Sequence, residues 1–547
     1  MKMRLKRFFY LLMLFALGAM LAMPGLSGAK EEEQAPGRKL ARQAIKDRKI
    51  WNTTDHTKHE ALRQNFKSGD EVTRACLTCH SEAEEQFKMT IHWTWIDPNS
   101  AKDTITGKAG HSLNNFCISA NKMKDKGCNS CHTGWNGKNE GVNCLVCHSQ
   151  KLSTLFNSNA DFDNIKEAFA TYKDFAEDPD AKEMADEIQT TIHQAVTDIG
   201  RPTRKNCGSC HFYGGGGDGV KHGDLDSSMT KPSKSLDVHM GLDGQNFQCT
   251  RCHTTKLHNI AGRIYATPAS MHRKSLIEDD LTPKIMCESC HSDKPHKSGS
   301  KPNDHTDKVA CQSCHIPEFA RANPTKMSWD WSKAGKLKDG KPYKVKGDFG
   351  KHNYLSIKGE MRWDKHVKPE YFWFNGSIIT LTAKDIIDPT QSVPVGKPVG
   401  AKDDPDSRIF PFKIHRGKQP YDKVNNTLLT PHLSGKKGYW ATLDWNKALS
   451  LGMKETGVPF SGEFDFVETT YAFPTTHMVA PREATVKCSE CHTRSDGRLA
   501  QLTGFYMPGR DCNDWLAKGG LLLVIGSLVG VFFHGVGRII SRKKKEV

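Results

Sequence analysis

The chain repeats the pattern Cys-x-x-Cys-His eight times, and no other feature restricts its fold as strongly. We number the copies motif 1 to motif 8 in chain order. Their residues are Cys76, Cys79, His80, Cys128, Cys131, His132, Cys144, Cys147, His148, Cys207, Cys210, His211, Cys249, Cys252, His253, Cys287, Cys290, His291, Cys311, Cys314, His315, Cys488, Cys491 and His492. The pattern is typical of covalent haem attachment, because the two thiols add to haem vinyl groups and the histidine binds the iron.

Zinc sites and disulfides are the alternatives for paired cysteines. A structural zinc site would combine two such pairs and would not need a histidine after each one. Eight copies that all end in histidine therefore predict eight covalently attached c-type haems as the cofactors.

The composition agrees with a haem-filled interior. Hydrophobic residues make up only 37 % of the chain, which is low for a globular protein, so we expect haem rings to supply part of the core. The formal net charge of +16 could indicate nucleic acid or an anionic membrane. We expect no nucleic-acid partner, because haem propionates would offset much of this charge and no nucleic-acid-binding motif accompanies it.

Both ends of the chain predict targeting to a membrane. Residues 1–29 combine a basic start, an apolar run and small residues, which is typical of a signal peptide, with an uncleaved anchor as the alternative. Residues 515–547 contain a second apolar run, 519–537, followed by basic residues, and predict a membrane anchor with a cytoplasmic tail. The haem-binding region 30–514 would then lie on the periplasmic side of the cytoplasmic membrane.

The expected fold class is mainly α with extensive irregular loops: a multihaem cytochrome c core, minor β hairpins and one C-terminal transmembrane helix. Residues 164–196 have helical spacing and predict one or two amphipathic helices. The haem-free block 316–487 predicts irregular structure with a few strands around the haem core. Within it, 371–381 predicts a hairpin that turns at Asn375-Gly376, and the Pro- and Gly-rich run 391–408 predicts a loop.

Electron-transfer haems usually need a second axial ligand besides the motif histidine. Histidines near a motif, or in polar or aromatic segments before one, are the candidates, although a surface histidine is the alternative for each. We prefer His56, His92, His239, His258, His296, His305 and His477 as metal ligands, with His222, His272 and His432 in reserve.

Motif 4 is followed by an unusual run of residues. Four glycines, Gly214–Gly217, precede a cluster of ionisable residues, which are Asp218, Lys221, His222 and Asp224. Glycine lets the backbone lie close to a flat, bulky group. A haem site next to so many ionisable groups indicates a reaction centre, and we expect the other haems to supply it with electrons.

These segments resemble the octahaem tetrathionate reductase family of multihaem cytochromes c. The resemblance rests on TTDHTKH at 53–59, ACLTCH and IHWTW within 75–95, NNFCI at 114–118, motifs 2 and 3, CGSCHFYGGGGDGVKHGDLD at 207–226 and VACQSCHIPEFAR at 309–321. It implies seven haems with two histidine ligands each and one catalytic haem with a lysine ligand. It also implies reduction of tetrathionate, nitrite and hydroxylamine.

Matched by position, the resemblance assigns the catalytic haem to motif 2, the ligand lysine to Lys221, the nearby acid to Asp218 and the active-site thiol to Cys117. Each has an ordinary alternative: a surface lysine, a turn residue and an inert buried cysteine. A lysine ligand must be neutral, which burial favours. A thiolate at Cys117 could exchange with a polysulfur substrate, and Asp218 could deliver protons.

Three functions stay open. The first is a membrane-anchored reductase of a small sulfur or nitrogen oxyanion, supplied by a quinol-linked membrane or periplasmic electron donor. The second is a hydroxylamine-oxidising enzyme, and the third is a pure electron carrier. Gly526 and Gly530 form a GxxxG pair, which agrees with a homo-oligomer paired through the membrane helix; ordinary membrane glycines are the alternative.

The motif count predicts the haem content. Mass spectrometry of the denatured holoprotein should show the polypeptide plus eight covalently bound haems, because each motif supplies two thiols for attachment. A fully matured protein with seven haems or fewer would mean that one motif has another role.

Overall fold

The computed structural model describes residues 35–46, 54–97, 100, 105–119, 131–135, 141–151, 161–262 and 285–544. The chain divides into two compact units, one made of residues 1–49 and 287–306 and the other of 50–286 and 307–547. The expected signal peptide, Cys128 and His272 lie outside the described residues.

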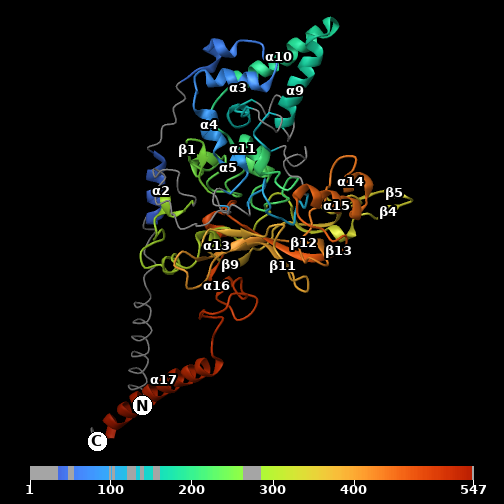
Figure 1. The fold of residues 1–547 in the computed structure, drawn as a ribbon. Helices are drawn as coiled ribbons and strands as arrows, with labels where there is room; N and C mark the ends of the chain where they lie inside the picture. The colour runs from blue at the N-terminus through green and yellow to red at the C-terminus, as the bar shows by residue number, and fades with distance from the viewer. Residues whose placement is uncertain are drawn as a thin grey trace. The chain divides into compact units, whose positions relative to one another are not determined.

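The helices are mostly short (Figure 1). The α-helices are α2 (Pro36–Lys46), α3 (Gly69–Leu77), α4 (Ala83–Lys88), α5 (Ile91–Thr94), α7 (Leu145–His148), α9 (Asp161–Ala176), α10 (Lys182–Thr197), α11 (Arg204–His211), α12 (Glu288–His291), α13 (Cys311–His315), α14 (Tyr439–Thr442), α15 (Trp445–Thr456), α16 (Cys488–Cys491) and α17 (Asp514–Lys544). The 3₁₀ turns are η1 (His56–Lys58), η2 (Glu60–Leu62), η3 (Pro179–Ala181), η4 (Ser227–Thr230), η5 (Cys249–Arg251), η6 (Lys301–Asp304), η7 (Trp331–Lys333) and η8 (Arg482–Ala484).

The strands gather late in the chain. They are β1 (Thr255–Lys256), β2 (Asn259–Ile260), β3 (Thr325–Asp330), β4 (Leu337–Lys338), β5 (Lys341–Pro342), β6 (Lys344–Lys346), β7 (His352–Leu355), β8 (Gly359–Asp364), β9 (Glu370–Phe374), β10 (Ile378–Thr380), β11 (Val393–Pro398), β12 (Arg408–Asp422) and β13 (Phe464–Pro474). Nine of them form one mixed sheet in the order β10-β11-β13-β12-β3-β8-β7-β6, with β9 also paired to β12.

Several haem motifs lie on helices of only four or five residues, namely α7, α12, α13 and α16. Helices this short are not stable alone in water, so they depend on their surroundings. Motif 4 has the best local support, because α11 begins with a capping box in which Thr203 and Asn206 bond each other's backbone.

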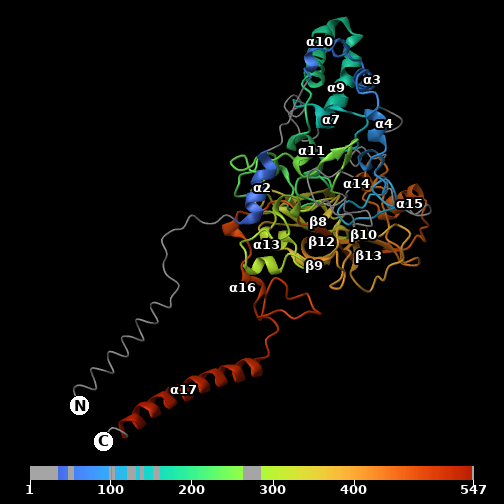
Figure 2. The ribbon, with the colours of Figure 1, turned by 90° about the vertical axis from the view of Figure 1, so that its left-hand side faces the viewer.

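The amphipathic helices expected at 164–196 are confirmed as α9 and α10, which lie side by side (Figure 2). Their apolar residues Ile165 and Ile192 are fully buried in a cluster with Leu145, so the helix pair packs directly against motif 3. Gln189 closes the contact, since its side-chain amide exchanges hydrogen bonds of 2.6 and 3.1 Å with the backbone of Phe66.

The expectation of a mainly α chain with minor β hairpins is wrong for residues 325–474. This part of the haem-free block forms the nine-stranded sheet, built around β12. β12 pairs antiparallel with β13 from Phe412–Pro474 to Asp422–Phe464, and parallel with β3 at Arg416–Ser328. The sheet was hard to detect because β12 is buried on both faces yet contains Lys413 and His415, which hide its apolar pattern.

Two finer expectations for this block also need correction. Strands do flank Asn375-Gly376, but β9 pairs with β12 and β10 pairs with β11, so they form no hairpin with each other. The run 391–408 is not all loop, because Val393 and Val395 in β11 are buried where this strand lies between β10 and β13.

The smaller unit contains α2, α12 and η6. The backbone amide of Gly37 in α2 donates a 3.0 Å hydrogen bond to the carbonyl of Pro295. A β-carbon at Gly37 would lie only 2.4 Å from the carbonyl oxygen of His291, so only glycine permits this approach. The start of α2 is thereby held against motif 6.

The C-terminal apolar run is confirmed as a helix, α17. Among the described residues it is the one helix long and apolar enough to cross a membrane, with a span at Asp514–Ser541 and a mean hydropathy of 2.1. Its large apolar side chains, including Leu522, Leu523 and Phe532, are exposed, as expected for a helix surrounded by lipid.

Removal of α17 should convert a membrane-bound protein into a soluble one. Truncation before Trp515 deletes this exposed apolar surface but leaves every haem motif in place, so the shortened protein should stay in the supernatant with its haems bound. Ultracentrifugation of both forms is the measurement. If the truncated form still pellets with membranes, a second anchor exists, and the N-terminal apolar run is the candidate.

Candidate functional site

Four of the motif histidines are oriented as metal ligands. The Nδ1 atoms of His148, His253 and His492 lie 3.0, 2.9 and 2.8 Å from the carbonyl oxygens of Gly200, Ala261 and Pro508. In the smaller unit, Nδ1 of His291 lies 3.2 Å from the carbonyl of Gly37. Donation from Nδ1 to a backbone carbonyl leaves Nε2 unprotonated and available to a metal, which is the usual arrangement of a ligand histidine.

Three motif histidines face a second histidine ring. The ring centres are 6.4 Å apart for His80 and His56, 6.2 Å for His211 and His92, and 6.3 Å for His253 and His477. An iron about 2 Å from one nitrogen of each ring would hold the centres about 6 Å apart. These pairs therefore fit the two axial positions of a haem, and they involve three of the histidines predicted as second ligands.

Burial favours the neutral, metal-binding form of three of these six rings. It lowers the pKa of His56 and of His92, and it lowers the pKa of His211 to about 3. His477 differs: burial acts to lower its pKa, but a hydrogen bond and the charge of Asp224 outweigh burial and raise it.

The other predicted ligands make contacts of different kinds. His258 lies edge-on to Phe87, and burial and the charge of His148 lower its pKa. His239 stacks on Phe247, with Nδ1 4.0 Å from Asp237. In the smaller unit, Nδ1 of His296 lies 3.2 Å from Asn303, and His305 ends η6.

The two described reserve histidines make different contacts. The ring of His222 meets Phe473 at a centre distance of 5.6 Å, and Nδ1 of His432 forms an ion pair of 3.0 Å with Glu455. Neither contact involves a motif histidine.

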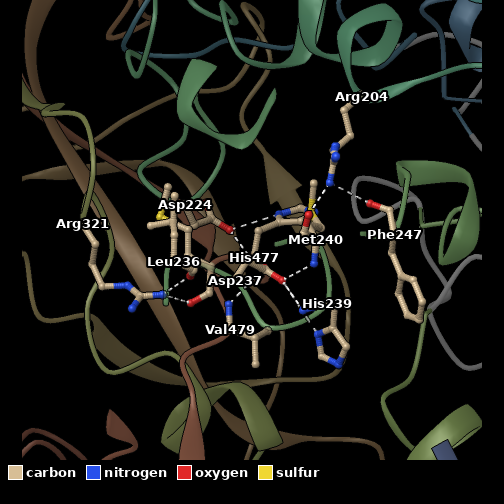
Figure 3. Close-up of polar contacts among 11 residues, drawn as sticks. Arg204, Asp224, Leu236, Asp237, His239, Met240, Phe247, Arg321, His477 and Val479 are labelled. Atoms are coloured by element: carbon tan, nitrogen blue, oxygen red, sulfur yellow. Dashed lines mark hydrogen bonds and ion pairs between the residues drawn. The ribbon is translucent and has the colours of Figure 1, made fainter. Parts of the chain in front are cut away.

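A buried polar cluster holds the segments that carry His239 and His477 (Figure 3). Asp237 accepts hydrogen bonds from the backbone amides of His239 and Val479, at 2.8 and 3.1 Å. Arg321 joins the same two segments, since its guanidinium donates to the carbonyls of Leu236 and Met478. Neither Asp237 nor Arg321 was predicted from the sequence. The position of Asp237, two residues before the predicted ligand His239, could have indicated it.

The attachment cysteines show which motifs are neighbours. All seventeen cysteines among the described residues are free of disulfides. Side-chain hydrogen bonds join Cys76 to Cys144, Cys131 to Cys210 and Cys207 to Cys249. With haem attached these sulfurs would carry vinyl carbons. The contacts therefore place motif 1 beside motif 3, motif 2 beside motif 4, and motif 4 beside motif 5.

The histidine of motif 2 differs from those above. Nε2 of His132 lies 3.0 Å from the carbonyl of Trp93, and its Nδ1 accepts a 3.3 Å hydrogen bond from the amide of Gly134. The rings of Trp93 and Trp95 cover it at centre distances of 4.9 and 5.3 Å. The histidine of motif 2 is thus covered by two tryptophan rings.

The structure brings the loop with Cys117 and the loop with Lys221 together. Gly215, at φ +81°, leaves room for the ring of Phe116, which a β-carbon there would meet at 2.9 Å. Phe116 also faces Lys221, whose Nζ lies 6.0 Å from the ring centre. Gly215 thus accommodates the flat ring of the residue next to Cys117.

Both loops rest on one face of the sheet. Asn115 ties the Cys117 loop to β12 and β13, because its amide donates to the carbonyls of His415 and Thr469 at 3.0 and 3.3 Å. Lys413 ties the other loop to β12. Lys413 is 2 % exposed, and its ammonium donates to the carbonyls of Val220 and Lys221 at 2.9 and 3.1 Å. Neither anchor was predicted, because nothing local in the sequence links β12 to these loops.

Lys221 is in a setting that favours its neutral form. Burial, with a smaller effect from the positive charge of Lys108, lowers the pKa of Lys221 to about 8. Aromatic rings surround its ammonium, since Phe473 lies 5.9 Å away in addition to Phe116. A neutral amine is the form that can donate a lone pair to iron.

Asp218 has a different orientation from the one expected of a proton donor. Its carboxylate accepts hydrogen bonds of 2.8 and 2.6 Å from the backbone amide and the hydroxyl of Ser227. These bonds close the turn after the glycines, so the alternative role of Asp218 in a turn has direct support. Both oxygens of this carboxylate are thus directed at Ser227 rather than at Lys221.

Two lysines that were not predicted lie near Cys117. Burial lowers the pKa of Lys326 and Lys358, and the charge of Cys117 acts in the opposite direction on both. Lys326 lies 3.4 Å from the ring centre of Trp329. Cys117 itself lines a narrow, largely apolar pocket with Leu113 and Gln419. Positive groups near a thiol favour its thiolate and attract anions.

Comparisons with known proteins agree with the haem motifs. The family profile described as "Cytochrome c7 and related cytochrome c" matches residues 233–316, and "Cytochrome c bacterial" matches 326–495. An uncharacterised protein of Archaeoglobus fulgidus is 22 % identical over 258 residues, 39 % of this chain and 79 % of that protein. A crystal structure of octahaem cytochrome c from Shewanella oneidensis is 39 % identical, with a TM-score of 0.65, over 81 % of this chain and 94 % of that one.

The similarity to the Shewanella oneidensis protein covers 94 % of that protein's chain. Its sequence identity of 39 % is high enough to indicate a common family and not only a common fold. Together with the facing histidine pairs, it means that the motifs bind c-type haems and that the protein transfers electrons. The chain belongs to the multihaem cytochrome c family.

Proposed function

We propose that this cytochrome is a membrane-anchored octahaem reductase of the tetrathionate reductase type. Electrons from a quinol-linked donor pass along the haems to a lysine-ligated haem at motif 2, where tetrathionate, nitrite or hydroxylamine is reduced. The haem region lies on the periplasmic side of the cytoplasmic membrane, held by α17, with the basic C-terminus in the cytoplasm.

The observation that carries this proposal is the meeting of the Cys117 and Lys221 loops beside motif 2. Phe116 packs between them, and Cys210 of the motif that precedes Lys221 lies beside Cys131. A buried amine with a lowered pKa, a thiol and a haem attachment site from three segments of the chain are thereby close together. A pure electron carrier would not need a thiol or a buried lysine at a haem.

The charges near the thiol support an anionic substrate. Lys326 and Lys358 lie near Cys117, and in their protonated form they would attract oxyanions of sulfur or nitrogen. A thiolate can attack an S–S bond and release a sulfur anion. Nitrite has no such bond, so it would not need Cys117.

Replacement of Cys117 should therefore separate the two substrate classes. Cys117→Ala should reduce tetrathionate turnover at least about tenfold, roughly 1.4 kcal/mol of barrier, and change nitrite turnover much less. The measurement is activity with a dye reductant. Cys512→Ala removes the other cysteine outside the motifs, which is exposed, and should leave both activities unchanged. Equal loss of both activities in Cys117→Ala would contradict the role in S–S exchange.

Replacement of Lys221 should alter one haem. Lys221→Met keeps a flexible side chain but removes the amine, so one haem spectrum in eight should change and both activities should fall. Electron paramagnetic resonance and the dye-reductant assay are the measurements. Lys336→Met, at an exposed lysine, is the matched control. If Lys221→Met leaves every haem spectrum and both activities as in the wild type, the reaction centre lies elsewhere and the pure electron carrier is the better description.

A further inference from the structure

Asp224 is a buried carboxylate bound to the ring of a predicted iron ligand. It is 2 % exposed, and its Oδ2 lies 3.3 Å from Nδ1 of His477. The same oxygen accepts a backbone hydrogen bond of 2.7 Å from Thr476. It accepts another of 2.9 Å from His477, which is drawn beside it (Figure 3). These bonds fix the carboxylate against the imidazole.

The carboxylate of Asp224 and the ring of His477 form an ion-pair contact of 3.3 Å. The cation that acts on it from the sheet is Lys413, whose three hydrogen bonds go to other oxygens. His477 is therefore the side chain with which Asp224 shares its charge most directly.

The predicted ligands of the other facing pairs have no such hydrogen bond. Nδ1 of His56 and of His92 has no hydrogen-bond partner, and the exposed Asp55 acts on His56 only through its charge. His253, the partner of His477, donates from Nδ1 to the neutral carbonyl of Ala261. Of the three predicted ligands in these pairs, His477 is therefore the one whose Nδ1 contacts a buried carboxylate.

We propose that Asp224 sets the reduction potential of the haem at motif 5, and makes it lower than the same two histidines would give with a neutral partner. A carboxylate that accepts the Nδ1 proton makes the imidazole a stronger donor to iron, and its charge favours the ferric state. Asp224 is thus a positioning and tuning residue that acts through His477. The proposal rests on one part of the proposed function, namely that His253 and His477 bind the same iron.

The position of motif 5 gives this lower potential a consequence. Its Cys249 lies beside Cys207 of motif 4, whose Cys210 lies beside Cys131 of motif 2. An electron on a low-potential haem at motif 5 would move readily to motif 4 and then to motif 2. Asp224 therefore favours electron flow toward the proposed reaction centre.

The test is Asp224→Asn in the haem-loaded, full-length protein, followed by spectroelectrochemical titration. One haem in eight should titrate at a higher potential, with at least a tenfold increase in its ratio of reduced to oxidised form at a fixed potential, or about 59 mV for one electron. Its low-spin resonance signal should change as well. The haem altered by Lys221→Met should keep its wild-type signal in Asp224→Asn, so failure of this proposal and failure of the lysine-ligated centre are distinguishable.

Asp422→Asn is the matched control. Asp422 is fully buried and accepts hydrogen bonds from Ser461 and Val424, but it contacts no imidazole, so no potential should shift. Asp224→Glu is a second variant that retains the charge and should shift the same haem less. Unchanged potentials in whichever Asp224 variant binds eight haems would overturn the proposal, and so would an equal shift in Asp422→Asn.

Discussion

The backbone pairing of β12 with β13 is the contact on which the arrangement of this cytochrome depends. It runs from Phe412 to Asp422 and creates a buried face with a row of polar side chains. Through Lys413 and the bonds of Asn115 to His415, that face holds two loops that are more than a hundred residues apart in the chain. The loops carry Lys221 and Cys117, so their geometry depends on a sheet that contains no haem motif.

The two parts of the larger unit are stabilised in different ways. The sheet has apolar clusters of its own, such as the one that includes Val395, Leu449 and Phe473. Much of the haem-binding part consists of short helices and loops, whose backbone cannot be held by helix formation alone. The low hydrophobic content is therefore unevenly distributed, and the haem rings matter most for the core around the motifs. A rigid sheet beneath the reactive loops fits the need to fix a ligand lysine precisely enough to bind a metal.

The sequence predicted features that depend on residues close together in the chain. The Cys-x-x-Cys-His motifs could be recognised directly, and His56, His92 and His477 could be chosen from the residues next to them. Each of these three histidines faces a motif histidine. The nine-stranded sheet could not be predicted, because β12 carries charged side chains on a buried strand and its partners lie before and after it in the chain. Asp224 and His477 are 253 residues apart, so no spacing rule connects them. Contacts between distant segments are set by tertiary packing.

The stretch from Lys221 to Asp224 joins two functions in one turn of the chain. Lys221 faces the loop with Cys117, and three residues later Asp224 binds the ring of His477, which faces motif 5. Between them, His222 is influenced by the charges of both. A displacement of this stretch would therefore change the lysine and the motif 5 ligand together. Lys413 opposes such a displacement, because it holds the backbone carbonyls of Val220 and Lys221 from the sheet. β12 thus helps to fix both the amine at the proposed reaction centre and the carboxylate that we propose acts on the haem at motif 5.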